Sequence, residues 1–290
     1  MGADYFKRLL VPIDGSRASL MAEETAINIA KKTGARVTVL HVLPYRRPYK
    51  ELAEEYHIPS DVGETILSSL EQRAETIIDA ARALFFEEGV KTETEIATAE
   101  GDIAESILRF ENNKFDLILV GAHGENEKDP YALGSVAKKL IMHTTRPLLI
   151  TKQQSSLSKI LVCVDGSRNS TDASKCASII ADKMGSKITF LNIQERQLRE
   201  ASLKTAKEVG QQILSRVMAS IGKTKVKVDQ ALEFGVPSNE ITEKAEHGNY
   251  DLIVLGKKGY GAVERFLLGS VADDVAQKSK RSVLIVPRCP

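Results

Sequence analysis

The segment Val11-Pro-Ile-Asp-Gly-Ser-Arg17 returns 151 residues later in the chain as Val162-Cys-Val-Asp-Gly-Ser-Arg168. The same offset relates the small and apolar positions that follow: Ala22, Ala26, Ile29, Ala30 and Gly34 correspond to Ala173, Ala177, Ile180, Ala181 and Gly185. A repeat that keeps one register over this length indicates two copies of a single structural unit.

Farther along, the offset between the copies becomes 135 residues. It relates Phe115–Gly121 to Tyr250–Gly256, Gly134–Ala137 to Gly269–Ala272, and Arg146–Ile150 to Arg281–Ile285. The first copy therefore contains 16 additional residues between Val42 and Phe115, which we place in segment 43–59. The simplest interpretation of that segment is a loop with a short helix over residues 50–56. A lid over the first site or a dimer contact is the alternative.

Each copy alternates short apolar strands with helical patterns. The strands are expected over 8–13, 37–42, 92–98, 117–120 and 147–151, and over 160–164, 188–193, 226–232, 252–255 and 282–286. Long second helices are expected over 62–88 and 199–222, third helices over 103–110 and 239–245, and last helices from Gly134 and Gly269. Buried strands alternating with helices predict an α/β fold with parallel sheets covered on both faces.

The predicted architecture is therefore two tandem, doubly wound, five-stranded parallel sheets with a flavodoxin-like strand order. We place the domains at 1–153 and 154–290, with a short linker rich in Gln and Ser over 152–158. A chain of 290 residues is long enough for two such cores.

Composition restricts the partners. A formal charge of +1 supplies no global field for nucleic acid or an anionic membrane, and no apolar run approaches the length of a membrane span. The N-terminus shows no signal-peptide pattern, and three scattered cysteines are typical of reduced thiols, so a cytoplasmic location is expected. Cys163 is interpreted as a small buried residue, with a redox role as the alternative.

Repeated polar residues fall at the carboxyl ends of strands, where doubly wound sheets bind ligands. Asp14 and Asp165 end the first strands, and each carboxylate could accept hydrogen bonds from a purine amine or a ribose hydroxyl. The alternative is that Asp-Gly-Ser only caps the next helix. After the fourth strand, glycines precede a Gly-Ser pair that opens a helix, and backbone amides at such a helix start suit a phosphate chain.

The spacing Gly-x-x-Gly, nine residues, Gly-Ser, placed after an Asp-ended first strand, resembles the universal stress protein family, and both copies contain it. In ATP-binding members of that family, the first-strand Asp and the end of the second strand hold adenosine, while the glycines, the Ser and the next residue hold phosphates. By resemblance the nucleotide residues are Asp165, Ile193, Gly256, Gly259, Gly269, Ser270 and Val271, and Asp14, Val42, Gly121, Gly124, Gly134, Ser135 and Val136.

The resemblance implies ATP, with or without Mg²⁺, as cofactor and a nucleotide-responsive stress module as function. It also implies an internal pseudo-dimer of the two halves, and a homodimer of chains as a further expectation. Two alternatives stay open: a nucleotide-independent interaction scaffold, and an ATPase of low turnover that would need Mg²⁺ beside the phosphates. No catalytic base is visible in the sequence.

The copies differ in loop charge. Copy two has Lys257, Lys258 and later Arg265, whereas copy one has Glu125, Glu127 and Asp129. Because carboxylates repel a triphosphate, we expect the second copy to bind better. A solvated surface turn is the alternative interpretation of the acidic loop, and the residues that follow Gly-Ser, namely Lys138, Lys139, Asp273 and Asp274, are expected to face away from the site.

Other site types lack their sequence patterns. The five histidines form no i, i+4 pair, so no metal site is expected. The chain contains no Gly-x-x-x-x-Gly-Lys-Ser/Thr loop, no Gly-x-Ser-x-Gly elbow and no Gly-x-Gly-x-x-Gly after the first strand. The absence of these three patterns argues against a P-loop ATPase, a hydrolase of the elbow type and a NAD enzyme.

Overall fold

A computed structural model describes most of the chain. The described residues are 6–44, 60–99, 101–112, 114–124, 129, 132–153, 156–222, 225–259 and 268–287. The short helix expected over 50–56, and with it the lid or dimer-contact alternative, lies outside these residues, as do Glu125, Glu127, Arg265 and Cys289.

The described elements repeat in the two halves. In the first half they are β1 (Arg8–Ile13), α1 (Arg17–Thr33), β2 (Arg36–Leu43), α3 (Ser60–Glu87), β3 (Thr92–Thr98), α4 (Ile103–Glu111), β4 (Leu117–Gly121), α5 (Ser135–His143) and β5 (Leu148–Thr151). In the second half they are β6 (Lys159–Cys163), α6 (Arg168–Met184), β7 (Lys187–Gln194), α7 (Arg196–Ala201), α8 (Leu203–Ile221), β8 (Val228–Phe234), α9 (Pro237–His247), β9 (Leu252–Gly256), α10 (Ser270–Lys278) and β10 (Ser282–Val286).

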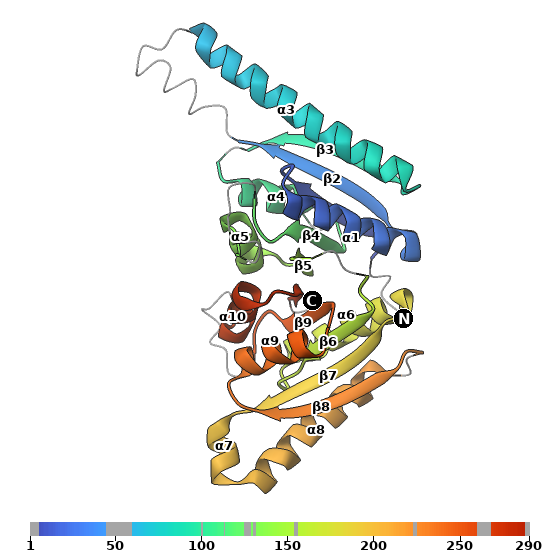
Figure 1. Ribbon diagram of the computed structural model, residues 1–290, viewed down its shortest axis with the longest axis vertical. Coiled ribbons are helices and arrows are strands. Elements are labelled where there is room, and N and C mark those ends of the chain that lie inside the picture. Colours follow the sequence, from blue (N-terminus) through green and yellow to red (C-terminus); the bar gives the residue numbers. More distant parts are fainter. Residues whose placement is uncertain are drawn as a thin grey trace.

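The ten strands form one continuous sheet, in the order β3-β2-β1-β4-β5-β10-β9-β6-β7-β8 (Figure 1). All pairs within a half are parallel, and the halves join where β5 and β10 run antiparallel, with Leu149 opposite Leu284. The last strands of the two copies are thus neighbours, so the internal duplication is also an internal pairing of the two units.

Helices cover both faces of this sheet. On one face, α1, α3, α6 and α8 pack over a core that includes Leu9, Val11, Ile160 and Val162. On the other, α4, α5, α9 and α10 pack over Leu10, Ile118, Leu161 and Ile253. Successive strand residues alternate between the two cores, as the pleat requires. Each core contains residues of both halves, so burial is continuous across the β5–β10 boundary. No helix in the described ranges is long and apolar enough to cross a membrane.

The predicted α/β class with two-sided helix cover is confirmed, with two differences. The two expected five-stranded sheets are joined through the antiparallel β5–β10 pair into one sheet, and the strand order within each half differs. Each half has the order 3-2-1-4-5, whereas flavodoxin has 2-1-3-4-5. The third strand is therefore an edge strand. Its burial agrees with this position, because Thr92–Thr98 has only exposed and partly buried residues, whereas the interior strand β2 is buried at nearly every residue.

Two further expectations are corrected. The helix predicted over 199–222 is two helices, because Ser202 breaks it with an extended backbone (φ −162°) and caps α8 by accepting a hydrogen bond from the Thr205 amide at 3.2 Å. Lys152, placed in the linker from sequence, is instead a buried residue, only 3% exposed, at the end of β5.

Candidate functional site

The first strand of each half ends in the same tight turn. Gly15 and Gly166 adopt left-handed φ angles of 84° and 85°, which glycine allows without a side-chain clash. This turn lets the amide of Ser16 donate to Asp14 Oδ1 at 3.0 Å, and Ser167 donates to Asp165 Oδ1 at 2.9 Å. The serines also cap α1 and α6, so the helix-cap interpretation is correct for them.

The second carboxylate oxygen of each Asp faces the loop after the fourth strand. A Cβ added to Gly124 would stand 2.8 Å from Asp14 Oδ2, and one added to Gly259 would stand 2.8 Å from Asp165 Oδ2. A side chain at either glycine would therefore force the Asp carboxylate to rotate away. The Asp at the end of the first strand and the second glycine of the loop, 110 and 94 positions apart in sequence, are therefore brought into direct proximity in both halves.

The first loop glycine serves the packing of helix against strand. A Cβ at Gly121 would lie 2.6 Å from the backbone carbon of Ala18, and one at Gly256 would lie 2.7 Å from that of Asn169. These helix backbones cannot withdraw without moving the first turn of α1 or α6. The packing thus requires glycine at both positions whatever ligand the loop contacts.

The loop also fixes the start of the last helix. The Gly134 amide donates to the Ala122 carbonyl at 2.7 Å, and the Gly269 amide donates to the Lys257 carbonyl at 2.9 Å. Because glycine occupies the N-cap, no side chain there caps the amides of α5 or α10. The first helical residues, Ser135 with Val136 and Ser270 with Val271, therefore present backbone donors at the positive end of the helix dipole.

The end of the second strand lies on the other side of the Asp. The carbonyls of Leu43 and Gln194 accept bonds from Ala99 and Gly235, on the side of the third strand. Because consecutive peptide groups of a strand point to opposite neighbours, those of Val42 and Ile193 face the side where the first strand has ended. Sequence reasoning missed a side-chain hydrogen bond that joins the second strand to the end of the first in each half. His41 Nδ1 contacts the Ile13 carbonyl at 2.9 Å, and Asn192 Nδ2 donates to the Val164 carbonyl at 2.7 Å.

The residues that sequence reasoning assigned to a site thus lie at the strand ends in each half. They supply a carboxylate with a glycine beside it, the outward peptide group of the second strand and the amides of a helix start. Such an arrangement can accept hydrogen bonds from an amine or a hydroxyl at one end and donate several to an anion at the other.

The charge attributed to Lys257 is a correction. Its Nζ donates to the carbonyls of Met142 at 2.7 Å and Thr144 at 2.9 Å, at the end of α5 in the other half. Burial, with the nearby charge of Lys258, lowers the pKa of Lys257 to about 8. Lys257 therefore supplies no charge to an anion at its own loop, because the side chain leaves the loop toward the first half.

All four charged residues after the Gly-Ser pairs were expected to face away from the site, and three of them have partners elsewhere. Lys139 pairs with Asp102 at 2.6 Å, and this partner lowers the pKa of the Asp102 carboxyl. Asp273 accepts a bond from Gln277 at 2.8 Å, and Asp274 pairs with Lys278 at 3.3 Å. Without Lys257, the positive charge of the second loop comes, among the described residues, from Lys258. The corresponding residue of the first loop is His123.

Two buried groups lie near the first strands. Cys163 belongs to the apolar core, and burial raises the pKa of its thiol, so its interpretation as a small buried residue is confirmed. Glu23 on α1 is only 6% exposed. Its burial, with smaller repulsion from Glu24 and Asp14, raises the pKa of Glu23 to about 7. The second half has Ser174 at this position, and sequence reasoning did not single out the difference.

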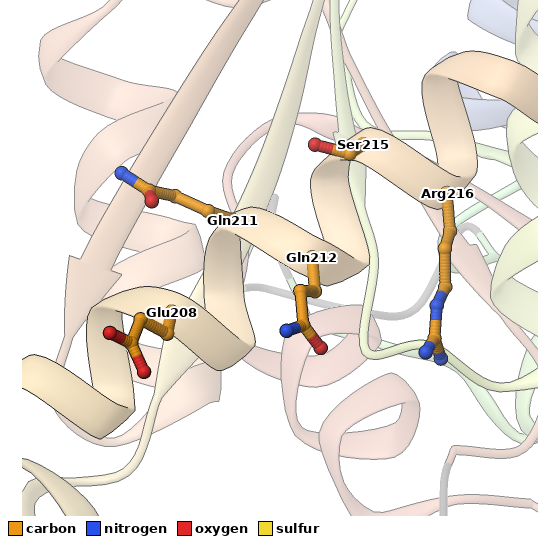
Figure 2. Close-up of a pocket in the computed structure, with 5 residues that line it drawn as sticks. All are labelled: Glu208, Gln211, Gln212, Ser215 and Arg216. Atoms are coloured by element: carbon orange, nitrogen blue, oxygen red, sulfur yellow. The ribbon is translucent and has the colours of Figure 1, made fainter.

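A shallow hollow elsewhere does not compete with these sites. It follows α8 and is lined by Glu208, Gln211, Gln212, Ser215 and Arg216, whose side chains spread along one helix rather than converge (Figure 2). All five residues are exposed, and one helix surface cannot enclose a ligand.

Comparison with known proteins agrees with this geometry. The sequence profile of the "Universal stress protein family" matches residues 5–152 and 157–287. Universal stress protein MJ0531 of Methanocaldococcus jannaschii is 33% identical over 153 residues, covering 52% of this chain and 85% of its own. Universal stress protein Slr1230 of Synechocystis is 23% identical over 298 residues, covering 96% and 99%.

The same architecture is found in a solved structure. The crystal structure of a universal stress protein from Archaeoglobus fulgidus superposes with a TM-score of 0.66, covering 98% of this chain and 99% of that one at 22% sequence identity. At this identity the likeness concerns the fold alone. The double match of the family profile, over nearly the whole length, concerns the sequence itself, and on that ground the chain belongs to the universal stress protein family.

Proposed function

We propose that the chain binds ATP at the strand ends of its halves and acts as a nucleotide-responsive stress module. One observation carries this proposal: the same cradle is built twice. In each half a loop glycine lies so close to the Asp that a Cβ on it would displace the carboxylate, and an N-cap glycine is hydrogen-bonded to the same loop. A chain that had become a ligand-free scaffold would have no need to keep both short contacts in both copies.

The proposed binding mode follows the chemistry of the groups. Asp14 and Asp165 accept hydrogen bonds from the adenosine, beside the peptide groups of Val42 and Ile193. The phosphates lie along the loop glycines (Gly121 and Gly124, or Gly256 and Gly259) and the amides of α5 or α10, beginning with Gly134, Ser135 and Val136, or Gly269, Ser270 and Val271. The helix start favours the anionic end of the ligand, because its dipole is positive there.

Magnesium would arrive with the phosphates. No group of three His, Cys, Asp or Glu side chains among the described residues could hold an ion by itself. A cation that keeps its waters and binds phosphate oxygens needs few protein ligands. Hydrolysis of ATP is not part of this proposal.

We further propose domains at 1–153 and 154–290, a cytoplasmic location and a homodimer of chains. The last strands β5 and β10 already pair within the chain, so a homodimer would use another surface. Sedimentation of the purified chain distinguishes a monomer of 31.8 kDa from a dimer.

The test begins with the protein as purified. The chain is denatured, and any released nucleotide is separated by chromatography and identified by its mass, for the wild type and for Gly134→Val and Gly269→Val. A Cβ at Gly134 would lie 3.1 Å from the His123 backbone, and one at Gly269 would lie 3.3 Å from the Gly259 amide. Each variant is expected to lose the nucleotide of its own half. Equal nucleotide content in all three chains would contradict the proposed sites.

A further inference from the structure

Two buried lysines cross between the halves in a reciprocal pattern. Lys257, 9% exposed, donates from the second half to the carbonyls of Met142 and Thr144. Lys152, 3% exposed, donates from the first half to the carbonyl of Ser279 at 2.7 Å and to that of Gln277 at 3.4 Å. The acceptors are equivalent positions, 135 residues apart, at the carboxyl ends of α5 and α10.

An ammonium suits these acceptors. The last carbonyls of a helix lack partners within the helix and carry the negative end of its dipole. Each lysine thus holds the last helix of the opposite half by its carboxyl end, close to the antiparallel β5–β10 pair.

The two lysines occupy positions in the chain that are not equivalent. The Ala122 amide donates to the Thr151 carbonyl at 3.0 Å, and the Lys257 amide donates to the Val286 carbonyl at 2.8 Å. The loop position and the position after the last strand are therefore neighbours in both halves. The first half has Ala122 in the loop and Lys152 after the strand, whereas the second has Lys257 in the loop and Pro287 after the strand.

Because of this difference, only one of the two lysines links one candidate site to the other. Lys257 is part of the glycine loop of the second site, and its carbonyl accepts the Gly269 amide that starts α10. Its ammonium holds α5, a helix of nine residues whose other end, at Ser135, is part of the first site. A helix this short is a rigid rod of about 14 Å. Lys152 also holds a helix, but it does not belong to a glycine loop.

We propose that Lys257 couples the two sites, so that nucleotide bound in one half strengthens binding in the other. This inference rests on the proposed function. Nucleotide that orders loop 256–259 also fixes the Lys257 peptide, and through the ammonium it holds α5 in position for a second nucleotide. The second nucleotide then does not have to order α5 on binding, so it binds more tightly. Because coupling between binding sites is reciprocal, nucleotide in the first half strengthens binding in the second by the same factor. Lys257 is a positioning residue here and does not contact the ligand.

The experiment places ATP in one half and observes the other. Gly124→Val weakens the first site, and ATP is added at a concentration that occupies mainly the second half. Hydrogen exchange of the α5 amides is then measured with and without ATP. We expect ATP to slow exchange in α5 by about fivefold or more, the usual lower range of coupling between sites.

Matched variants separate coupling from general loosening. In the Gly124→Val background, Lys257→Met should abolish the effect of ATP on α5, and Lys152→Met should retain it. Each substitution replaces a buried lysine at the β5–β10 boundary with an uncharged side chain of similar volume. If Lys257→Met does not fold, Lys257→Gln, which keeps a donor but shortens the reach, serves in its place.

The outcomes are distinct. If ATP protects loop 256–259 and α10 but leaves α5 unchanged, the proposed function stands and the coupling is wrong. If Lys152→Met removes the effect as fully as Lys257→Met, the boundary as a whole transmits it and Lys257 has no special role. If ATP protects neither half, the proposed function fails and the coupling fails with it.

Discussion

Gly259 lies against Asp165 so closely that a Cβ on the glycine would stand 2.8 Å from the carboxylate oxygen Oδ2. The two residues belong to different strand ends of the second half, and Gly124 repeats the relationship with Asp14 in the first. The carboxylate is the end of a flexible side chain, so it can move aside when the glycine is replaced. The fold should tolerate such a replacement, whereas a ligand that needs the Asp should not.

Gly259→Val should therefore weaken ATP binding in the second half by at least about tenfold, through loss of one charged hydrogen bond and of the space above it. Calorimetric titration of this variant and of Gly124→Val measures the effect on each half. The circular dichroism spectrum should stay that of the wild type. Unchanged binding in both variants would mean that the Asp-glycine contact is not part of a ligand site.

Gly256→Ala should act on stability instead. Its Cβ would lie 2.7 Å from the backbone of Asn169, and a helix backbone cannot rotate away as a carboxylate can. We expect a loss of about 1–3 kcal/mol in the free energy of unfolding, the usual cost of overpacking. Gly259→Ala, three residues away in the same loop, is the matched control. Urea denaturation that ranks the two variants in the opposite order would contradict this assignment.

Glu23 should make stability depend on pH. Burial raises its pKa from 4.5 to about 7 in the folded chain, so the folded state binds more protons than the unfolded state between these values. Stability then falls as pH rises through this window, and the full penalty, on the order of 3 kcal/mol, is present above pH 7. Glu23→Gln keeps the shape and removes the titration.

The comparison is made by denaturation at pH 5 and pH 8. Glu23→Gln should gain stability over the wild type at pH 8 and less at pH 5. Glu24→Gln, at the less buried neighbouring position, should keep most of the wild-type pH dependence, because burial is the larger cause of the Glu23 shift. A pH dependence that is the same for the wild type and Glu23→Gln would show that Glu23 does not cause it.

Much of the fold could be predicted from the internal repeat. The matching of Val11–Arg17 with Val162–Arg168 predicts two copies of one unit, and β1 has the predicted bounds. The strand order was predicted less well, although the half-exposed pattern of β3 indicates an edge. The break at Ser202 was missed because a serine inside a helical pattern is read as tolerated, while here its hydroxyl caps a new helix.

The charges could not be assigned from sequence. Lys257 stands between two loop glycines, and its sequence neighbours indicate a phosphate loop. Its actual partners, the carbonyls of Met142 and Thr144, become neighbours only because β5 and β10 pair. A local motif does not contain that long-range arrangement. The burial of Glu23 could not be predicted for the same reason, because it depends on the tertiary packing of α1.

Equilibrium dialysis of the intact chain against ATP tests the central claim most directly. The account predicts saturable binding with a dissociation constant below about 1 mM, and weaker binding by Gly259→Val and by Gly124→Val. Absence of binding in that range by the folded wild-type chain would contradict it and leave the chain as a scaffold that keeps the fold without the ligand.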